Sequence, residues 1–225
     1  MATLDLQEQE QLDALKALWK RYGNLVTWTV VVVLVALGAW NGWRWWQREQ
    51  ALGAGAMYDE LERAAEAGDA AKTARVFADL SERYPRTAYA AQGGLLDAKT
   101  QADNGRAEAA RASLTWVALH GGDDALQTVA RLRLAASLAD AAQYAPALEQ
   151  LERAKARGFE ALVADRRGDI LAVQGKRADA RAAYEAAYRA FDEKADYRRV
   201  VEAKLMALGA APPAAKASAA SEAAS

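Results

Sequence analysis

The sequence predicts an all-α protein in which one N-terminal transmembrane helix precedes a solenoid of repeated helix pairs. Three observations indicate this fold. No charged residue occurs between Tyr22 and Trp43, and small and bulky residues recur at regular intervals further along the chain. The 225 residues are also rich in alanine, leucine, glutamate and arginine, with only four prolines. These residues lose little conformational freedom in a helix.

The composition argues against several classes of function. A net charge of −1 provides no general attraction for nucleic acid. The sequence has no cysteine and a single histidine, His120, so thiol chemistry, His-based metal sites and Ser-His-Asp triads lack their parts. We expect no catalytic residue, cofactor or metal, and we expect His120 to interact with the terminal carbonyls of a helix. An enzyme such as a peptidase remains an alternative, although the sequence offers no preferred acid.

The apolar stretch over residues 23–46 is the predicted transmembrane helix. Its core, Leu25–Trp43, would be about 28 Å long at the helical rise, close to the roughly 30 Å of a hydrocarbon core. A buried core helix and a cleaved signal peptide are the alternatives, but the stretch lacks a polar face and the preceding segment is long and acidic. Aromatic rings favour the membrane interface, and those assigned to the anchor and its interfaces are Trp19, Tyr22, Trp28, Trp40, Trp43, Trp45 and Trp46.

Residues 1–22 form a predicted amphipathic arm. Leu12, Leu15 and Leu18 are spaced by three and, with Trp19 and Tyr22, form one apolar stripe on a helix. This stripe predicts a helix that lies at the membrane surface, with a docking site for a cytoplasmic partner as the alternative. Three basic residues precede the apolar core Leu25–Trp43 and two follow it closely, which favours a cytoplasmic N-terminus.

Residues 47–208 contain an internal repeat. Breaks between paired helices fall at Gly68, Gly105, Ala142 and Gly175, and the spacings of these positions are 37, 37 and 33 residues. Small residues recur seven before and five after the break, and bulky residues recur nine after it. This pattern predicts helix pairs that cross closely and end in a left-handed turn. The residues assigned to repeat packing are Gly68, Gly105, Ala110, Ala147, Gly168, Gly175, Ala180 and Tyr184.

The repeats predict four helix pairs and a C-terminal capping helix. The expected helices are residues 52–67, 70–84, 87–103, 106–119, 123–141, 144–157, 160–174, 177–191 and 196–208. An irregular bundle whose alanines coincide by chance is the alternative. Residues 209–225 contain little besides alanine, proline and serine, so we expect this tail to be disordered.

The repeat resembles the tetratricopeptide (TPR) repeat, whose usual period is about 34 residues. The last pair fits best, and the first pair fits least well because Leu61 and Thr73 stand where small residues are expected. An atypical terminal repeat is typical of a cap. The resemblance implies a TPR-like solenoid with a concave surface lined by the first helix of each pair.

Two registers of these first helices are the predicted lining of a groove, one ten residues before the break and one six residues before it. Their apolar members could bind an extended or helical apolar segment, or they could serve only as packing. A clamp for a terminal carboxylate is not expected, because acids dominate these helices. The candidate groove residues are Tyr58, Leu95, Lys99, Leu132, Ala136, Asp165 and Asp169.

The arm and the anchor together resemble the start of the YfgM family, which comprises bacterial ancillary subunits of the SecYEG translocon. The order of arm, anchor and TPR-like domain agrees with that family over essentially the whole chain, apart from the tail. The motifs that carry the resemblance are Asp5-Leu-Gln-Glu-Gln-Glu-Gln-Leu-Asp13, Leu15-Lys16, Trp19-Lys20, Tyr22-Gly-Asn24 and Asn41-Gly-Trp43.

The resemblance implies a single-pass protein of the bacterial inner membrane, with a cytoplasmic N-terminus and a periplasmic repeat domain. It also implies SecYEG and the membrane-anchored periplasmic chaperone PpiD as partners, and unfolded polypeptides as clients. We therefore expect a membrane-tethered protein-interaction module that aids the handover of translocated chains. A TPR scaffold of another cell-envelope assembly, in division or wall machinery, is the alternative.

Overall fold

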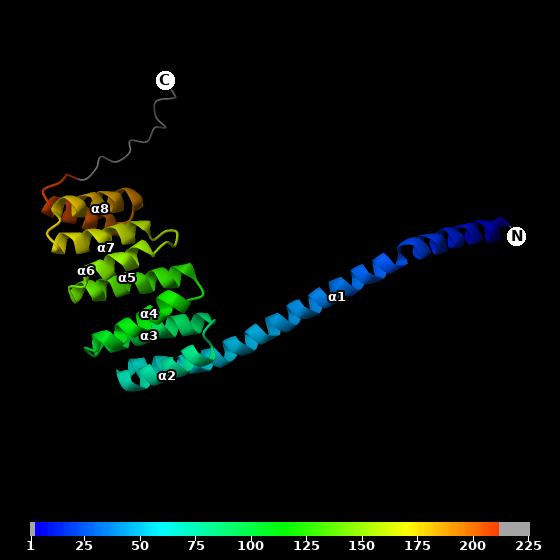
Figure 1. Cartoon of the computed structure of the whole chain (residues 1–225), viewed down its shortest axis with the longest axis horizontal. Helices are drawn as coiled ribbons and strands as arrows, with labels where there is room; N and C mark the ends of the chain where they lie inside the picture. The colour runs from blue at the N-terminus through cyan, green and yellow to red at the C-terminus, as the bar shows by residue number, and fades with distance from the viewer. Residues whose placement is uncertain (1–2, 212–225) are drawn as a thin grey trace, which may run out of the picture. The chain divides into compact units, whose positions relative to one another are not determined.

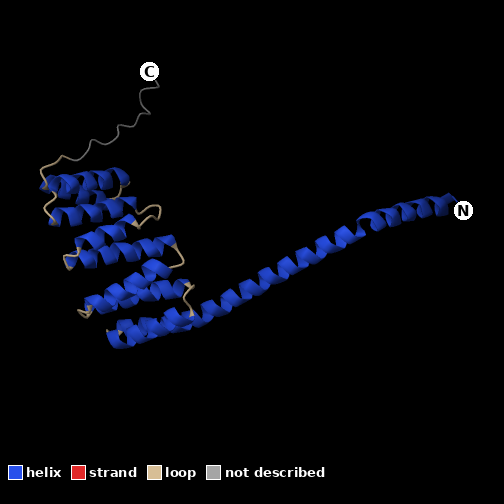
Figure 2. Ribbon diagram, in the orientation of Figure 1, coloured by secondary structure: helices blue, strands red, loops and turns tan. Residues whose placement is uncertain are grey.

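The computed structural model describes the backbone of residues 3–211 and, within them, the side chains of all but residues 3–15, 17, 18 and 26. Helices connected by turns and short loops make up this range, and no strand occurs in it (Figure 2). The predicted all-α class is therefore confirmed. The predicted tail lies outside the described residues from position 212 onward, as do the arm side chains of Leu12, Leu15 and Leu18.

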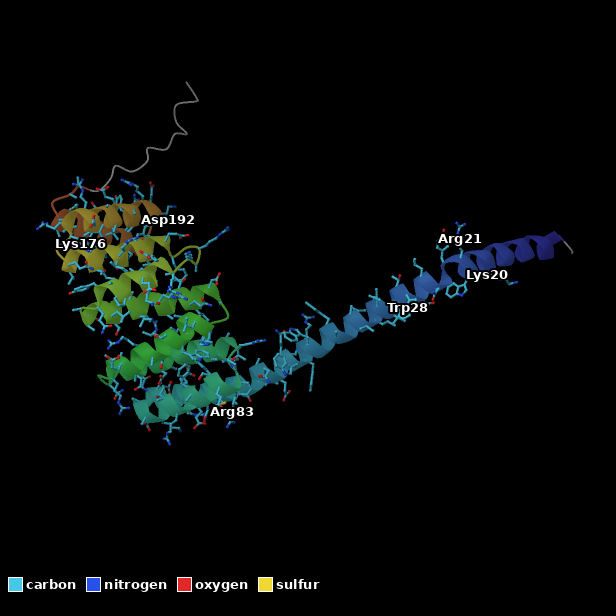
Figure 3. The ribbon with its side chains drawn as sticks, in the orientation of Figure 1. Lys20, Arg21, Trp28, Arg83, Lys176 and Asp192 are labelled. Carbon is cyan, nitrogen blue, oxygen red and sulfur yellow. The ribbon has the colours of Figure 1, made fainter. Side chains whose placement is uncertain are left out.

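The first helix, α1 (Thr3–Glu66), includes the anchor and the first helix of the first pair without a break. The chain divides into two compact units at Leu52 and Gly53. In the first unit the apolar side chains are largely exposed, and Trp28, which follows Lys20 and Arg21 along α1 (Figure 3), is 63% exposed.

Hydroxyl groups inside the anchor are satisfied within the helix. The Oγ1 atoms of Thr27 and Thr29 donate to the carbonyls of Gly23 and Leu25, each over 2.8 Å. Hydrocarbon offers no hydrogen-bond partners, so polar groups in a membrane span must bond internally. The exposed apolar surface and these internal bonds both suit a lipid environment.

The second unit is a stack of helix pairs (Figure 1). From α2 onward each helix packs against the next along the chain, and α3 also contacts α5, which in turn contacts α7. The first helices of successive pairs therefore lie side by side, as in a solenoid. After α1, the described helices are α2 (Ala70–Arg83), α3 (Ala88–Asp103), α4 (Ala107–His120), α5 (Asp124–Asp140), α6 (Tyr144–Glu152), α7 (Glu160–Val173), α8 (Arg177–Ala190) and α9 (Asp196–Ala207).

The residues that recur with the breaks lie in the core. At Gly168, an added Cβ would lie 2.5 Å from the Tyr184 ring. A methyl group does not fit there, so glycine lets α7 and α8 approach closely. The other small and bulky members of the pattern are buried as well: Ala98, Ala110, Ala135, Ala147, Ala180, Phe77, Leu114 and Leu151.

The turns inside the pairs adopt the left-handed conformation. At Gly105 φ is 74°, and at Ala142, which is not glycine, φ is 57°. The amide of Ala142 donates to the Ala139 carbonyl over 2.9 Å and that of Gln143 to the Leu138 carbonyl over 2.8 Å. These two bonds form a Schellman motif. Because Ala142 has a Cβ, this conformation costs roughly 1 kcal/mol more than it would for glycine.

The helix α6 is shorter than predicted, because it ends at Glu152 rather than at residue 157. It has nine residues, whereas α2, α4 and α8 each have 14. The repeat that begins at Ala142 is also the shortest, at 33 residues. A full-length α6 would leave only residues 158 and 159 to reach α7, so the last turns unwind to make the connection.

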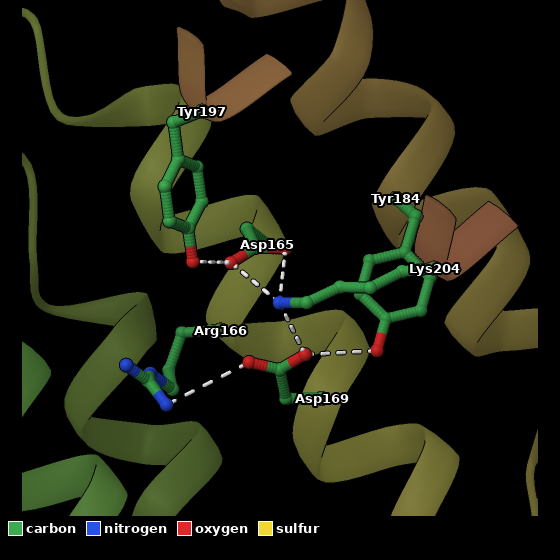
Figure 4. A network of polar contacts seen from close by, with 6 residues as sticks. All are labelled: Asp165, Arg166, Asp169, Tyr184, Tyr197 and Lys204. Carbon is green, nitrogen blue, oxygen red and sulfur yellow. Dashed lines mark hydrogen bonds and ion pairs between the residues drawn. The ribbon is translucent and has the colours of Figure 1, made fainter. Parts of the chain in front are cut away.

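The last helix, α9, is joined to α7 by a partly buried polar network (Figure 4). The Nζ atom of Lys204 lies 2.7 Å from Oδ1 of Asp165 and 2.7 Å from Oδ1 of Asp169. The hydroxyl of Tyr197 donates to Asp165 over 3.0 Å, and that of Tyr184 donates to Asp169 over 2.9 Å. The network therefore connects three helices, α7, α8 and α9.

The environment of the network favours one set of protonation states. Burial by itself would lower the pKa of Lys204, but the hydrogen bonds and negative charges of Asp165 and Asp169 outweigh burial and raise this pKa. Burial, followed by the hydrogen bond to a carboxylate, raises the pKa of both Tyr184 and Tyr197. At neutral pH the lysine is therefore charged and both phenols are neutral, which are the forms that the hydrogen bonds require.

Replacing Ala142 with glycine is expected to raise the free energy of unfolding by about 1 kcal/mol, because glycine adopts a positive φ without steric strain. The matched reverse change, Gly105→Ala, should lower it by about 1 kcal/mol. Urea denaturation of the full chain in mild detergent, followed by circular dichroism, measures both. Equal stabilities for the two variants would contradict this account of the turns.

Replacing Lys204 with methionine is expected to lower the free energy of unfolding by about 2–3 kcal/mol, because it leaves a buried carboxylate without its counter-charge. The Asp165 side chain is only 3% exposed, whereas that of Lys204 is 25% exposed. The control is Lys194→Met, an exposed position outside the network, which should change stability little. Similar losses for both variants in the same denaturation assay would exclude this role of Lys204.

The network also predicts a loss of stability in alkali. The folded pKa values of Lys204, Tyr184 and Tyr197 lie above their ordinary values of 10.5, 10.0 and 10.0. Their contribution is therefore complete below about pH 10 and is lost as the pH rises through the folded values. The melting temperature should fall as the pH rises above about 10, and fall less in a Lys204→Met, Tyr197→Phe variant. An equal fall in both proteins would refute the link.

Candidate functional site

Two neighbouring cavities lie along the first helices of the central pairs. One, of about 740 Å³, lies between α3, α4 and α5, and the other, of about 320 Å³, lies between α5, α6 and α7. Both are lined by Ala136 and Asp140 of α5, so they adjoin each other along this helix. We call these two adjoining cavities the α5 groove.

The walls of the α5 groove are built largely from small apolar side chains. Ala98 and Ala102 come from α3, and Ala136 and Ala139 come from α5. Small side chains leave room for atoms of a partner close to the helix backbone, where apolar contact excludes water. The groove therefore suits a peptide segment with apolar side chains.

Charged side chains surround this apolar floor, and several are already paired. Lys99 binds Asp103 over 2.6 Å. Arg111 is held by Glu108 and by Ser137, whose hydroxyl lies 3.2 Å from its guanidinium.

Two charged side chains on the exposed surface of α5 lack such partners. Within residues 3–211, the side chains of Arg133 and Asp140 make no ion pair or hydrogen bond. They are seven residues apart, about 10 Å along the helix. One acid and one base of a partner could therefore pair with them at the rim of the groove.

The structure separates the two predicted registers. Lys99, Ala136 and Asp169, which stand six residues before the breaks, line the α5 groove. Leu95 and Leu132, which stand ten residues before, are half-buried and pack against core clusters. These two leucines therefore act mainly in packing.

Two further candidates lie away from the open groove. Asp165 is 2% exposed and is bonded to α9, so it lines no open surface. Tyr58 is half-buried, with its ring centroid 5.7 Å from that of Tyr89. Burial, and then the charge of Glu62, raises the pKa of Tyr58, which therefore stays neutral at physiological pH.

Sequence reasoning missed Arg133, Asp140 and Arg166 as groove residues. Arg133 and Arg166 stand nine residues before Ala142 and Gly175, and Asp140 stands two residues before Ala142. Positions nine, six and two before the break lie on one helix face. The recurring arginine was therefore a usable signal in the sequence.

The remaining polar groups give little support for chemistry. Among the side chains that the structure describes, no group of three or more histidines, cysteines or carboxylates could hold a metal ion. The Nδ1 atom of His120 lies 3.0 Å from the Trp116 carbonyl, and its ring stacks on that of Trp116. His120 thus interacts with the last turn of α4, as its position predicts.

Within the described part of the chain, one helical stretch, Trp19–Glu66, is long and apolar enough to cross a membrane. It contains the predicted anchor. Only a small share of the most apolar part of this helix is buried against the rest of the protein. This exposure agrees with a membrane span rather than with a core helix.

Comparisons with known proteins agree with the predicted repeat fold and with the family resemblance. The family described as tetratricopeptide repeat-like domain matches residues 16–210. A Neisseria gonorrhoeae protein named ancillary SecYEG translocon subunit is 27% identical over 90% of this chain and 98% of its own length. Proteins of the same name from Haemophilus influenzae and Escherichia coli are 29% and 31% identical, over 81% and 80% of this chain and 89% and 86% of their own lengths. No solved structure matches the chain.

The family match extends across the anchor and the repeat domain together. The family match alone covers well over half of the sequence, and the similarity to the three relatives covers 80–90% of this chain. The chain therefore belongs to the tetratricopeptide repeat-like family and, with these relatives, to the YfgM family that its arm and anchor resemble.

Proposed function

We propose that this protein is an ancillary subunit of a SecYEG translocon, held in the inner membrane by α1, and that its repeat domain binds other proteins. The observation that carries the proposal is the similarity to a protein named ancillary SecYEG translocon subunit, which extends along 98% of that relative's length. The N-terminus is then cytoplasmic and the repeat domain periplasmic.

The α5 groove is the proposed binding surface. Its alanine floor offers apolar contact, and the unpaired Arg133 and Asp140 offer one charge of each sign at the rim. An extended or helical segment with apolar side chains and flanking charges fits this arrangement. Specific ion pairs at a rim mainly select the partner and its register.

The membrane anchor compensates for weak binding in the groove. A tethered domain meets a neighbouring protein at an effective concentration that reaches the millimolar range for short linkers. PpiD, as a membrane-anchored periplasmic chaperone, and polypeptides that emerge from the translocon are the proposed partners. The protein then brings a chaperone close to the translocon exit and aids the handover of translocated chains.

Site-specific photo-crosslinking in cells tests this proposal, with probes in place of Trp28 in the anchor and Arg133 in the groove. The anchor probe should capture SecYEG subunits, and the groove probe should capture PpiD or translocated chains. A probe at Ala112, which is exposed on α4 and lines neither cavity, is the matched control. Adding Ala136→Glu should reduce the groove adducts about tenfold, because it puts a charge on the apolar floor, and should leave the anchor adducts unchanged.

Two outcomes would contradict the proposal in different ways. Anchor adducts with a division or wall assembly, and none with SecYEG, would refute the translocon function. Equal adducts at Arg133 and Ala112 would exclude the α5 groove as the binding surface while leaving the translocon association intact.

A further inference from the structure

The charged residues around the α5 groove leave two positions open for the side chains of an occupant. Arg133 and Asp140 are exposed on α5 and form no ion pair or hydrogen bond with the side chains that the structure describes. One of them is basic and the other acidic, so the order of charges along an occupant matters more than its net charge. The other charged residues of the lining already have partners: Lys99, Arg111, Arg166 and Asp169.

The chain leaves the repeat domain beside one end of this groove. After α9, the amide of Ala210 donates to the Leu205 carbonyl over 3.0 Å and ties the chain back to the helix. Ala210 is 4% exposed and belongs to the same core cluster as Leu171 of α7. Leu171 lies two residues before Val173, which lines the groove and is 70% exposed. The remaining part of the tail, residues 212–225, therefore follows from a fixed point near the α7 end of the groove.

This part of the tail is long enough to reach α5. Val173 and Asp140 each stand two residues before a repeat break, so they lie at the same level of α7 and α5, and both line the groove. Packed helices lie about 8–10 Å apart, so two spacings, from α9 past α7 to α5, amount to roughly 16–20 Å. The five residues from Ala211 to Lys216 span up to about 17 Å, and the lysine side chain extends this reach.

The sequence of the tail has the pattern of a short amphipathic helix. In a helix, three alanines at a spacing of four residues fall on one face, and Lys216 and Glu222 flank that face on its two sides. Alanine has the highest helix propensity, and a segment that is disordered alone can fold on contact. Small side chains also suit the alanine floor of the groove. The alanines are Ala215, Ala219 and Ala223, and the serines that fall away from their face are Ser218, Ser221 and Ser225.

The charges of such a helix match those of α5 in order and in spacing. A chain that enters past Val173 meets Asp140 first and Arg133 later, just as Lys216 precedes Glu222 along the tail. Lys216 and Glu222 are six residues apart, about 9 Å on a helix, and Arg133 and Asp140 are seven residues apart, about 10 Å. A tail helix antiparallel to α5 therefore sets each charge opposite one of the other sign.

We propose that residues 212–225 bind the α5 groove of their own chain as a short helix, with Lys216 on Asp140 and Glu222 on Arg133. The inference rests on the proposed function of the groove, because the tail then competes with the partner. Tethering gives the tail a high effective concentration, so weak contacts suffice. A groove that the tail covers for nine tenths of the time binds a partner about tenfold more weakly, so weak apolar segments are excluded.

An intrachain disulfide tests the contact in the full chain, held singly in nanodiscs. The chain has no cysteine, so Ala136→Cys on the groove floor and Ala219→Cys on the alanine face of the tail form the only pair. Oxidation by copper phenanthroline should close this pair at least about tenfold faster than Ala136→Cys with Ser221→Cys, because the second tail position has nearly the same tether but points away. Ala112→Cys on α4 with Ala219→Cys is a second control.

Exchanging the charges tests their order without changing the net charge. Lys216→Glu with Glu222→Lys should slow closure of the Ala136→Cys, Ala219→Cys disulfide about tenfold, because it sets like charges against each other. Adding Arg133→Asp with Asp140→Arg to the same chain should restore the rate. Circular dichroism of each variant shows whether its fold is intact. Damage to the fold by either exchange would not produce this recovery.

Competition with a partner is measured in cells, with a photo-crosslinking probe in place of Ala102, which is exposed and lines the groove. Ending the chain after Ala211 should raise the yield of groove adducts at least about threefold. Adducts that form equally with and without the tail would overturn the competition. An absence of adducts in both forms would instead contradict the proposed partner binding, and the disulfide would still establish or exclude the tail contact.

The disulfide experiment can overturn the contact itself in three ways. Equal closure rates for the Ala219→Cys and Ser221→Cys pairs would mean that the tail has no preferred face. An unchanged rate after the charge exchange would mean that the two ion pairs do not form. Disulfides between chains at high protein concentration in detergent, with none inside a chain, would mean that the tail of a second copy fills the groove.

Discussion

The close crossing of paired helices is the constraint on which the rest of the repeat domain depends. At Gly168 the space for a Cβ is taken by the Tyr184 ring, only 2.5 Å away. Dense packing of this kind leaves paired helices little freedom to slide or rotate. The first helices α3, α5 and α7 consequently present equivalent faces to one side, and the α5 groove results from this alignment.

The network around Lys204 determines where the groove ends. On α7, Asp165 and Asp169 occupy the repeat positions that Leu132 and Ala136 occupy on α5. Lys204 of α9 binds both of these carboxylates. An end helix of a solenoid must cover apolar surface that a further repeat would otherwise bury. Here the cap also neutralises two acids, so α7 contributes only its nearer part to the α5 groove.

Local patterns in the sequence were sufficient to predict the helix pairs, because a glycine that ends a helix and a small residue at a crossing act over a few residues. The end of α6 was not predictable from such patterns, since Arg153–Arg157 alternates good helix formers and only the short connection to α7 prevents a helix there. One of the two predicted groove registers was missed by one position. Each residue turns a helix by about 100°, so the choice between Leu132 and Arg133 decides between core and surface. The apolar character of Leu132 was a sign of packing.

The proposed binding surface includes α7, and the packing of this helix has a mechanical consequence. α7 presents Arg166 and Asp169 to the α5 groove. Since Gly168 holds the same helix against Tyr184, a partner on one face gains little by displacing α7. Coupling between sites requires an element with two arrangements of similar energy, and a clamped α7 does not provide one. We therefore expect a partner in the α5 groove to be held in a fixed position rather than switched between two arrangements.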